Sequence, residues 1–368
     1  MAVVTIHRLG RLMAGALALA CASLLPMAPG PAEASTANQS KSVATAKAKS
    51  RPAAKPGAKA GARKPVRVAA PRRPSVGHFT GLHSTEDPLT LQSSVALVVD
   101  RNTNEVLFSK NPEAVLPIAS ITKLMTALVV MEAGLPLDEP LTVSQDDVRG
   151  TVGSGIRSQL RPGTQLTRGE LMHLSLMASE NRAAYALGRN YPGGLGAFVR
   201  AMNSKAAELG MVDTRYVEPT GLSSDNRSSA LDLARLVKAA SEHPVIRDLS
   251  TSLHAVLPVG PKPRPVEFRN TNGLVKNPAW EIGLQKTGFI SAAGRCVVMQ
   301  AELAGRQLIM VLLDSAGRYS RIGDAERLRK WLSEQSLLPA FSLRSEPLAE
   351  PETPQPTAER ALPGVSAN

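Results

Sequence analysis

The sequence predicts an α+β fold built on one antiparallel sheet that is flanked by helices and carries a helical subdomain as an insertion. Apolar strand-like runs occur near both ends of the segment 88–340, and helix-like patterns fill its middle. The strands follow one another through short polar or glycine-containing turns, which is typical of antiparallel hairpins. Because the first and last strands need a shared core, we expect them to join in one sheet.

The first hairpin and the first helix follow from local patterns. Val95–Val99 is a continuous apolar run, and Arg101–Asn104 turns the chain into a second run, Glu105–Phe108. Polar turn residues between two such runs predict an antiparallel pair. An apolar helix is then expected to open after Pro117 and to end at Gly134.

The middle of the segment is predicted to be helical. Thr167 and Glu170 form a capping-box pattern in front of an apolar stretch. Ser179 interrupts this helical pattern, which resumes over Arg182–Arg189, and Ser229 stands at the start of a further helix. We expect three strands and a last helix to follow, at residues 283–288, 296–303, 307–313 and 321–333.

Composition divides the 368 residues into four parts. We predict a signal peptide over residues 1–34, a basic disordered linker over 35–87, the folded domain over 88–340, and a disordered Pro/Glu-rich tail over 341–368. The net charge of +12 is concentrated in the linker, whereas acidic and basic residues balance beyond it. The positive charge therefore carries no information on what the folded part binds.

The first 34 residues have the three parts of a secretory signal. Arg8 and Arg11 supply positive charge, Leu12–Met27 contains no charged residue, and Ala32-Glu33-Ala34 forms a small-x-small cleavage site. We therefore expect the mature protein to be secreted and to work in the periplasm. Removal of this segment would leave Cys296 as the single cysteine, so a disulfide within the mature chain is excluded.

The linker is predicted to be disordered because it offers almost no large apolar side chain to offset the entropy of ordering. Lys and Arg alternate there with Ala and Pro, and no acidic residue occurs over 35–80. Such a polycation is expected to bind an anionic wall or membrane surface. A plain solvated tether is the alternative. Nucleic acid is not an expected partner, because no aromatic residue is interleaved with the charges.

Ser120-Ile121-Thr122-Lys123 is the only S-x-x-K pattern in the chain. On a helix this spacing is one turn, so the hydroxyl and the amine lie on one face. The lysine can act as a base only when it is neutral, which requires burial or a neighbouring cation to lower its pKa from about 10.4. Taken alone, the pattern is more typical of a helix cap and a solvated lysine.

Two further motifs change that interpretation. Ser179-Glu180-Asn181 lies at the helix break, and Lys286-Thr287-Gly288 ends a strand that precedes an apolar hairpin. S-x-x-K, S-x-N and K-[ST]-G in this order form the signature of penicillin-recognising serine enzymes. Over residues 90–335 the sequence resembles the low-molecular-mass penicillin-binding proteins, the serine D-alanyl-D-alanine peptidases. That resemblance implies the transpeptidase-like fold shared with serine β-lactamases, and makes 88–340 a catalytic domain.

The resemblance also implies the catalytic roles. Ser120 is expected to be the acylated nucleophile and Lys123 the base that takes its proton. Ser179 would relay a proton to the leaving amine. Asn181 would hold Lys123 and the substrate amide.

The third motif is implied to bind the substrate. Lys286 would keep the site electropositive, Thr287 would bind a terminal carboxylate, and Gly288 would let the substrate lie against the strand. The backbone N–H groups of Ser120 and Phe289 would form the oxyanion hole. No cofactor or metal is expected, since the histidines show no ligand spacing such as H-E-x-x-H.

A second match to the middle motif occurs at Ser224-Asp225-Asn226. It follows a Thr-Gly-Leu loop and directly precedes a helix start, so we expect an Asx turn or a cap there. Ser179 is preferred because it lies between two helical stretches, where the family has this loop.

Several functions remain open on sequence grounds. We expect a peptidoglycan D,D-endopeptidase that cuts cross-linked stem peptides and is inhibited by β-lactams. Glu180 in the S-x-N motif, the expected absence of a second β-rich domain and the expected absence of a C-terminal anchor favour it over a D-alanyl-D-alanine carboxypeptidase. A serine β-lactamase and a non-catalytic wall-binding protein are also compatible with these patterns. Contacts to the acceptor strand of a cross-link are expected from the loop 150–161.

Overall fold

The computed structural model describes residues 74–152 and 158–336. The predicted signal peptide, most of the predicted linker and the predicted tail lie outside the described residues. Within the described ranges, no helix is both long enough and apolar enough to cross a membrane.

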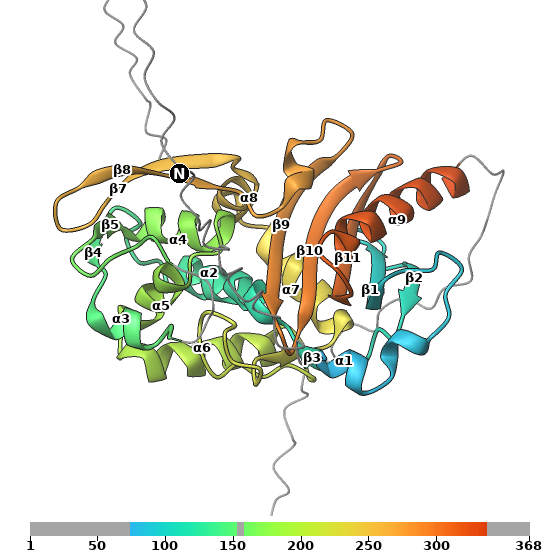
Figure 1. Cartoon of the computed structure of the whole chain (residues 1–368), viewed down its shortest axis with the longest axis horizontal. Coiled ribbons are helices and arrows are strands. Elements are labelled where there is room, and N and C mark those ends of the chain that lie inside the picture. The colour runs from blue at the N-terminus through green and yellow to red at the C-terminus, as the bar shows by residue number, and fades with distance from the viewer. Residues whose placement is uncertain (1–73, 153–157, 337–368) are drawn as a thin grey trace, which may run out of the picture. The chain divides into compact units, whose positions relative to one another are not determined.

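A five-stranded antiparallel sheet occupies the right-hand half of Figure 1, with its strands in the order β2-β1-β11-β10-β9. The first hairpin and the last three strands of the sequence therefore share one sheet, which confirms the predicted α+β class. The strands are β1 (Ser93–Asp100), β2 (Val106–Lys110), β9 (Glu281–Ile290), β10 (Gly294–Leu303) and β11 (Arg306–Ser315).

Both faces of this sheet are buried. Leu97 of β1 belongs to the hydrophobic core on one face and Val98 to the core on the other, because successive side chains of a strand point to opposite faces. Helix α7 (Ala230–Ser241) packs on the first face and helix α9 (Ser320–Ser336) on the second. Covering on both sides explains why every residue of β1 is buried.

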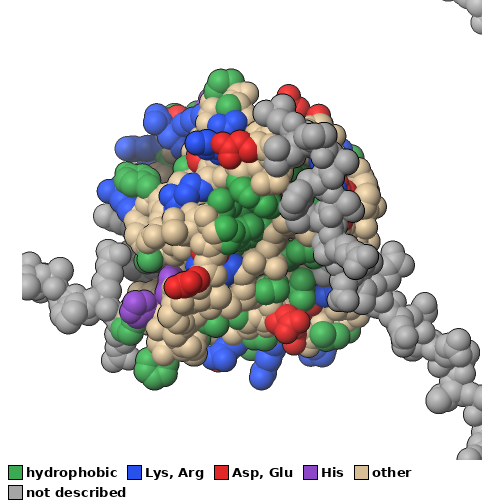
Figure 2. All heavy atoms as spheres, turned by 90° about the vertical axis from the view of Figure 1, so that its right-hand side faces the viewer, with side chains coloured by type: hydrophobic (Ala, Val, Ile, Leu, Met, Phe, Trp, Pro, Cys, Tyr) green, Lys and Arg blue, Asp and Glu red, His purple; other side chains and the backbone are tan. Residues whose placement is uncertain are grey.

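The face that carries β2 and the end of α9 is turned to the viewer in Figure 2. Hydrophobic side chains gather near its centre, with basic and acidic side chains scattered around them. The mixture of charges on this face agrees with the balance of acidic and basic residues beyond the linker.

Helices fill the other half of the molecule (Figure 1). Helix α2 (Thr122–Glu132) lies at its centre, and its residues from Thr122 to Val130 are all buried. The helices around it are α3 (Gln145–Arg149), α4 (Arg168–Met177), α5 (Asn181–Arg189), α6 (Gly194–Glu208) and α8 (Pro244–Thr251).

The helix starts predicted at Thr167 and Ser229 are confirmed, whereas the helix expected to open after Pro117 begins at Thr122. The Thr167 hydroxyl accepts from the Glu170 N–H at 3.1 Å, and the Glu170 carboxylate accepts from the Thr167 N–H at 2.8 Å. This reciprocal capping box satisfies two N–H groups at the start of α4. Ser229 caps α7 in a similar way, by accepting from the Asp232 N–H at 3.2 Å.

Short elements connect these parts. The 3-10 helices are η1 (Leu82–Ser84), η2 (Ala119–Ile121) and η3 (Gly273–Lys276). Three small antiparallel pairs complete the described chain: β3 (Leu116–Pro117) with β6 (Arg227–Ser228), β4 (Pro140–Thr142) with β5 (Gln165–Thr167), and β7 (His254–Val259) with β8 (Arg264–Arg269).

The predicted boundary at residue 88 lies too late in the chain. Residues 76–79 form helix α1, whose Val76 N–H donates to the Ala292 carbonyl at 2.9 Å. The His83 imidazole lies 3.1 Å from the Asp314 carboxylate. These contacts to the β9–β10 turn and to β11, far along the chain, give the end of the predicted linker an ordered place that its local composition does not reveal.

Helix α6 and the β7–β8 hairpin were not expected from the sequence. Three glycines, at positions 193, 194 and 196, lower the helix propensity where α6 begins. The helix nevertheless buries Phe198, Met202 and Ala206, which recur every four residues on one face. Tertiary packing of this narrow stripe overrides the weak local preference.

Candidate active site

Ser120 lies in η2, immediately before the buried helix α2, so the predicted nucleophile is held on a 3-10 turn and not within the α-helix itself. Its neighbour Ala119 has a φ of 47°, a left-handed conformation that is strained for a residue other than glycine. Gly221, with a φ of +80°, approaches this turn so closely that a Cβ there would stand 1.8 Å from the Ala119 carbonyl oxygen. The loop around Gly221 therefore supports the strained turn.

The Lys123 amine has three partners. It lies 2.8 Å from the Ser120 hydroxyl, 2.8 Å from the Asn181 side-chain oxygen and 2.6 Å from the Thr220 carbonyl oxygen. The amide and carbonyl oxygens can only accept, whereas the serine hydroxyl can also donate. A neutral amine has two hydrogens for the two obligate acceptors and a lone pair for the hydroxyl. The geometry thus fits a neutral lysine that accepts the Ser120 proton.

Burial supplies the neutral form. It lowers the pKa of Lys123 to about 7, against the partial opposition of the Glu218 and Glu180 carboxylates, which raise it. Desolvation disfavours the charged amine because its three polar partners replace the hydration of an ammonium ion only in part. Of the two causes considered from the sequence, burial and a neighbouring cation, burial is the one that acts on Lys123.

The second predicted serine lies at the break between α4 and α5. Ser179 has a φ of 59°, and its hydroxyl accepts from the Lys286 amine at 2.9 Å. Burial lowers the pKa of Lys286 well below its ordinary value, and the Lys123 and Arg321 charges lower it further. A lowered pKa works against a permanent positive charge on Lys286. Its clearer contribution to the site is therefore the hydrogen bond that it donates to Ser179.

Strand β9 forms the remaining wall and carries the third motif. Thr287 shares a hydrogen bond of 2.6 Å with the hydroxyl of Thr271, which precedes η3. A Cβ on Gly288 would lie 3.0 Å from the Ile118 carbonyl oxygen and 3.2 Å from the Ser120 nitrogen. Only a glycine lets the strand approach the nucleophile turn this closely. Phe289 follows on the same strand. The Arg295 guanidinium carbon lies over the Phe289 ring, 4.6 Å from the ring centroid.

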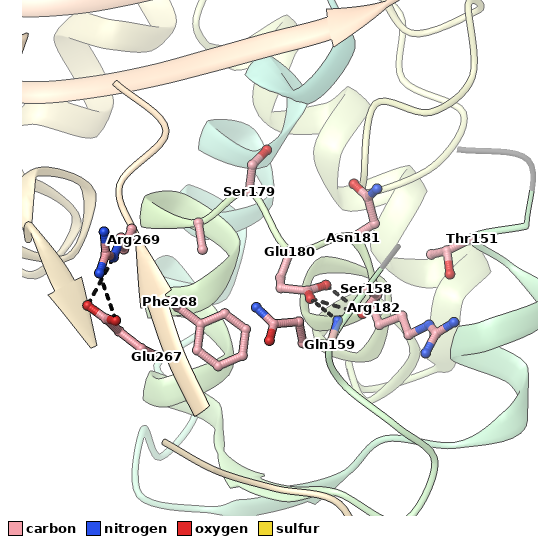
Figure 3. A pocket seen from close by; sticks show the side chains of 11 residues that line it. Thr151, Ser158, Gln159, Ser179, Glu180, Asn181, Arg182, Glu267, Phe268 and Arg269 are labelled. Carbon is pink, nitrogen blue, oxygen red and sulfur yellow. Dashed lines mark hydrogen bonds and ion pairs between the residues drawn. The ribbon is translucent and has the colours of Figure 1, made fainter. Parts of the chain in front are cut away.

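Glu180 has a structural function that its place in the motif did not reveal. Its carboxylate accepts from the Ser158 hydroxyl at 2.8 and 3.0 Å and from the Gln159 N–H at 2.9 Å. Figure 3 shows these bonds on one side of a cavity whose other side is formed by Phe268 on β8. Glu180 thereby ties the S-x-N motif to the loop that was expected to contact an acceptor strand.

The structure also identifies residues that the sequence analysis left without a role. The Glu218 carboxylate accepts from the Thr220 N–H at 2.6 Å and from the Gly221 N–H at 2.7 Å. It thus fixes the peptide whose carbonyl accepts from Lys123. The signal was present in the Glu-Pro-Thr-Gly-Leu stretch at 218–222, but no pattern indicated that its backbone reaches the lysine.

The second S-D-N match is part of the scaffold. Asn226 is fully buried, and its side-chain oxygen accepts from the Val217 N–H at 2.8 Å and the Glu218 N–H at 3.3 Å. Its amide donates to the Glu218 carbonyl and to the Thr122 hydroxyl. The predicted Asx turn or cap is therefore wrong, because Asn226 anchors the 217–222 loop to Thr122 at the start of α2.

Comparison with known proteins identifies the family. Residues 82–317 match the family described as D-alanyl-D-alanine carboxypeptidase. The chain belongs to this family. It is 48% identical over 242 residues to a D-alanyl-D-alanine endopeptidase of Pseudomonas aeruginosa, an alignment that covers 66% of this chain and 77% of the relative. A D-alanyl-D-alanine endopeptidase of Escherichia coli is 43% identical over 273 residues, covering 74% and 87%.

The D-alanyl-D-alanine peptidase fold is also shared with solved structures. A point mutant of a Streptomyces DD-transpeptidase superposes with a TM-score of 0.61 at 25% identity, covering 66% of this chain and 97% of that one. The predicted transpeptidase-like fold and the assignment to the serine D-alanyl-D-alanine peptidases are therefore confirmed.

Proposed function

We propose that this enzyme is a peptidoglycan D,D-endopeptidase, which hydrolyses D-alanyl cross-links through an acyl-enzyme on Ser120. The observation that carries the proposal is the Lys123 amine, buried between two obligate acceptors and the Ser120 hydroxyl. The relatives that are 48% and 43% identical are both named D-alanyl-D-alanine endopeptidase, which favours cross-links over free pentapeptides as substrates.

Acylation begins with transfer of the Ser120 hydroxyl proton to Lys123. The serine oxygen attacks the D-alanyl carbonyl carbon, and the backbone N–H groups of Ser120 and Phe289 stabilise the developing oxyanion. The close packing of Gly288 on the nucleophile turn supports this pairing of N–H groups.

Breakdown of the tetrahedral intermediate breaks the carbon–nitrogen bond. The leaving amine takes a proton from the Ser179 hydroxyl, which in turn takes the proton that Lys123 received from Ser120, and the acyl group stays on Ser120. Lys286 lies within hydrogen-bond distance of Ser179, as Lys123 does of Ser120. A water molecule, deprotonated by Lys123, then attacks the ester, and Lys123 returns the proton to the Ser120 oxygen as the carbon–oxygen bond breaks and the donor peptide leaves.

The substrate is held on both sides of the scissile bond in this proposal. Asn181 binds Lys123 through its oxygen, which leaves its amide N–H₂ to donate to the substrate carbonyl. The Thr287 hydroxyl, positioned by Thr271, binds the carboxylate next to the leaving amine.

Location and tethering complete the proposal. The signal pattern at 1–34 supports secretion to the periplasm, where the peptidoglycan substrate lies. The Lys/Arg-rich segment that follows is proposed to bind an anionic wall or membrane surface and so to hold the enzyme near its substrate.

The decisive test compares two substrates with the mature enzyme. Cross-linked muropeptide dimers and monomeric pentapeptides are supplied side by side, and products are identified by mass spectrometry. Faster release of monomers from dimers than of D-alanine from pentapeptides supports the endopeptidase, and the reverse ranking would make the enzyme a carboxypeptidase.

A β-lactam provides the chemical control. Intact mass after penicillin treatment should show one covalent adduct that is lost in Ser120→Ala. Hydrolysis of that adduct many times per second would favour a serine β-lactamase instead.

A further inference from the structure

Two cavities lie beside the S-x-N motif and share a wall. The first, of about 350 Å³, extends from Ser179 between the loop residues Ser158 and Gln159 and the strand residue Phe268. The second, of about 800 Å³, is also lined by Ser158 and Gln159 and continues along the same hairpin to Val266. The shared lining makes them one groove that leads away from Ser179, and Figure 3 shows the side chains of its first part.

Strand β8 explains the direction of this groove. Arg264, Val266 and Phe268 alternate along the strand, so their side chains point to the same face. Phe268 is 3% exposed and packs in the main core, and Val266 packs against that core. The groove therefore has an apolar stripe along β8. Acidic and basic side chains both line its Ser179 end, whereas the charged side chains at its end toward the hairpin turn are all basic.

That far end is strongly basic. Arg161, Lys262 and Arg264 line the second cavity, and no carboxylate lines it among the described residues. None of the three forms an ion pair with an acidic residue of the described chain. Three like charges around one cavity repel each other, and a bound anion would relieve that repulsion.

Glu180 holds the shared wall in position. Its bonds to Ser158 and Gln159 join the groove directly to the motif that carries Ser179. Under the proposed function, Ser179 gives its proton to the leaving amine, so whatever is attached to that amine begins at the Ser179 end of the groove. In a cross-link, this is the acceptor stem peptide.

We infer that this groove is the acceptor-strand subsite and that Arg161, Lys262 and Arg264 bind carboxylates of the acceptor stem peptide. The inference rests on the proposed endopeptidase function and deepens it. An acidic peptide matches the groove because its chain can lie on Phe268 and Val266 while its carboxylates reach the basic end. A free D-alanine leaving group is too short to reach there.

The test removes the basic end without touching the catalytic residues. The double variant Lys262→Gln/Arg264→Gln is compared with the control Arg200→Gln/Lys330→Gln, which removes two exposed cations that line neither cavity. Each mature full-length enzyme receives cross-linked dimers with free acceptor carboxylates, the same dimers with these carboxylates amidated, and monomeric pentapeptides.

The double variant should lose about tenfold in kcat/KM on the free-carboxylate dimer, mainly through a higher KM, because contacts remote from the reacting bond contribute uniform binding. It should cut amidated dimers and pentapeptides as the wild type does, and penicillin should acylate it at the wild-type rate. The control variant should behave as wild type throughout.

Two outcomes separate this inference from the proposed function. If the wild type cuts free and amidated dimers equally, or the double variant keeps its full rate on free dimers, the basic subsite is refuted while the endopeptidase stands. If the wild type is acylated by penicillin but does not cut dimers at all, both are refuted.

Discussion

The pH dependence of acylation tests the central claim that buried Lys123 is the base. With a pKa of about 7, Lys123 is neutral in about one molecule in eleven at pH 6 and in about ten of eleven at pH 8. The second-order rate of acylation by a penicillin should therefore rise about tenfold between these values. An ordinary lysine, with a pKa of about 10.4, would be neutral in fewer than about one molecule in a thousand at pH 7.

A variant can then shift this titration in a direction set by the structure. The Glu180 carboxylate raises the pKa of Lys123 because a negative charge stabilises the ammonium form. Glu180→Gln removes that charge, so the midpoint of the rising limb should move to lower pH.

The assay is stopped-flow acylation by a fluorescent penicillin from about pH 5.5 to about pH 9, with Lys123→Ala as the inactive reference. A wild-type midpoint above about pH 9 would refute the neutral-base assignment. A midpoint that rises in Glu180→Gln would refute the electrostatic reasoning.

Three further predictions concern the scaffold and the linker. Gly221→Ala should unfold the nucleophile turn, with a lower Tm and no penicillin adduct. Gly134→Ala, where φ is +62° but a Cβ meets nothing within 4 Å, should cost only the left-handed backbone strain of about 1–2 kcal/mol. Wild-type acylation by Gly221→Ala would contradict this. Asn226→Ala should lower the free energy of unfolding, measured in urea, by about 2–4 kcal/mol, because it leaves buried backbone groups unpaired. A loss under about 0.5 kcal/mol would show that Asn226 does not anchor the 217–222 loop. Deletion of residues 35–73 should leave acylation unchanged and abolish salt-sensitive binding to peptidoglycan sacculi or anionic vesicles. If binding is equal and insensitive to salt with and without this segment, the segment is only a spacer. The deletion stops there because α1 begins at Val76 and packs on the domain.

Much of the fold was accessible from local patterns. The strands of the central sheet alternate or run continuously in apolar residues, and the starts of α4 and α7 carry capping residues. Helix α6, the β7–β8 hairpin and the order of the segment before residue 88 were not accessible. Each of these depends on partners distant in the chain, such as the Ala292 carbonyl that accepts from Val76.

By itself, the sequence determined the family and the candidate site residues. The order of the three short motifs and their spacing can be read along the chain, without knowledge of which residues lie close together in space. Only the tertiary structure decided how these residues are held. Burial is a property of the packed fold, and burial is what lowers the pKa of Lys123. The contacts that hold Lys123 come from α5 and from the 218–222 loop, whose residues meet only when the helical half closes around α2. The groove beside Ser179 likewise exists only because Glu180 binds a loop some twenty residues earlier in the chain.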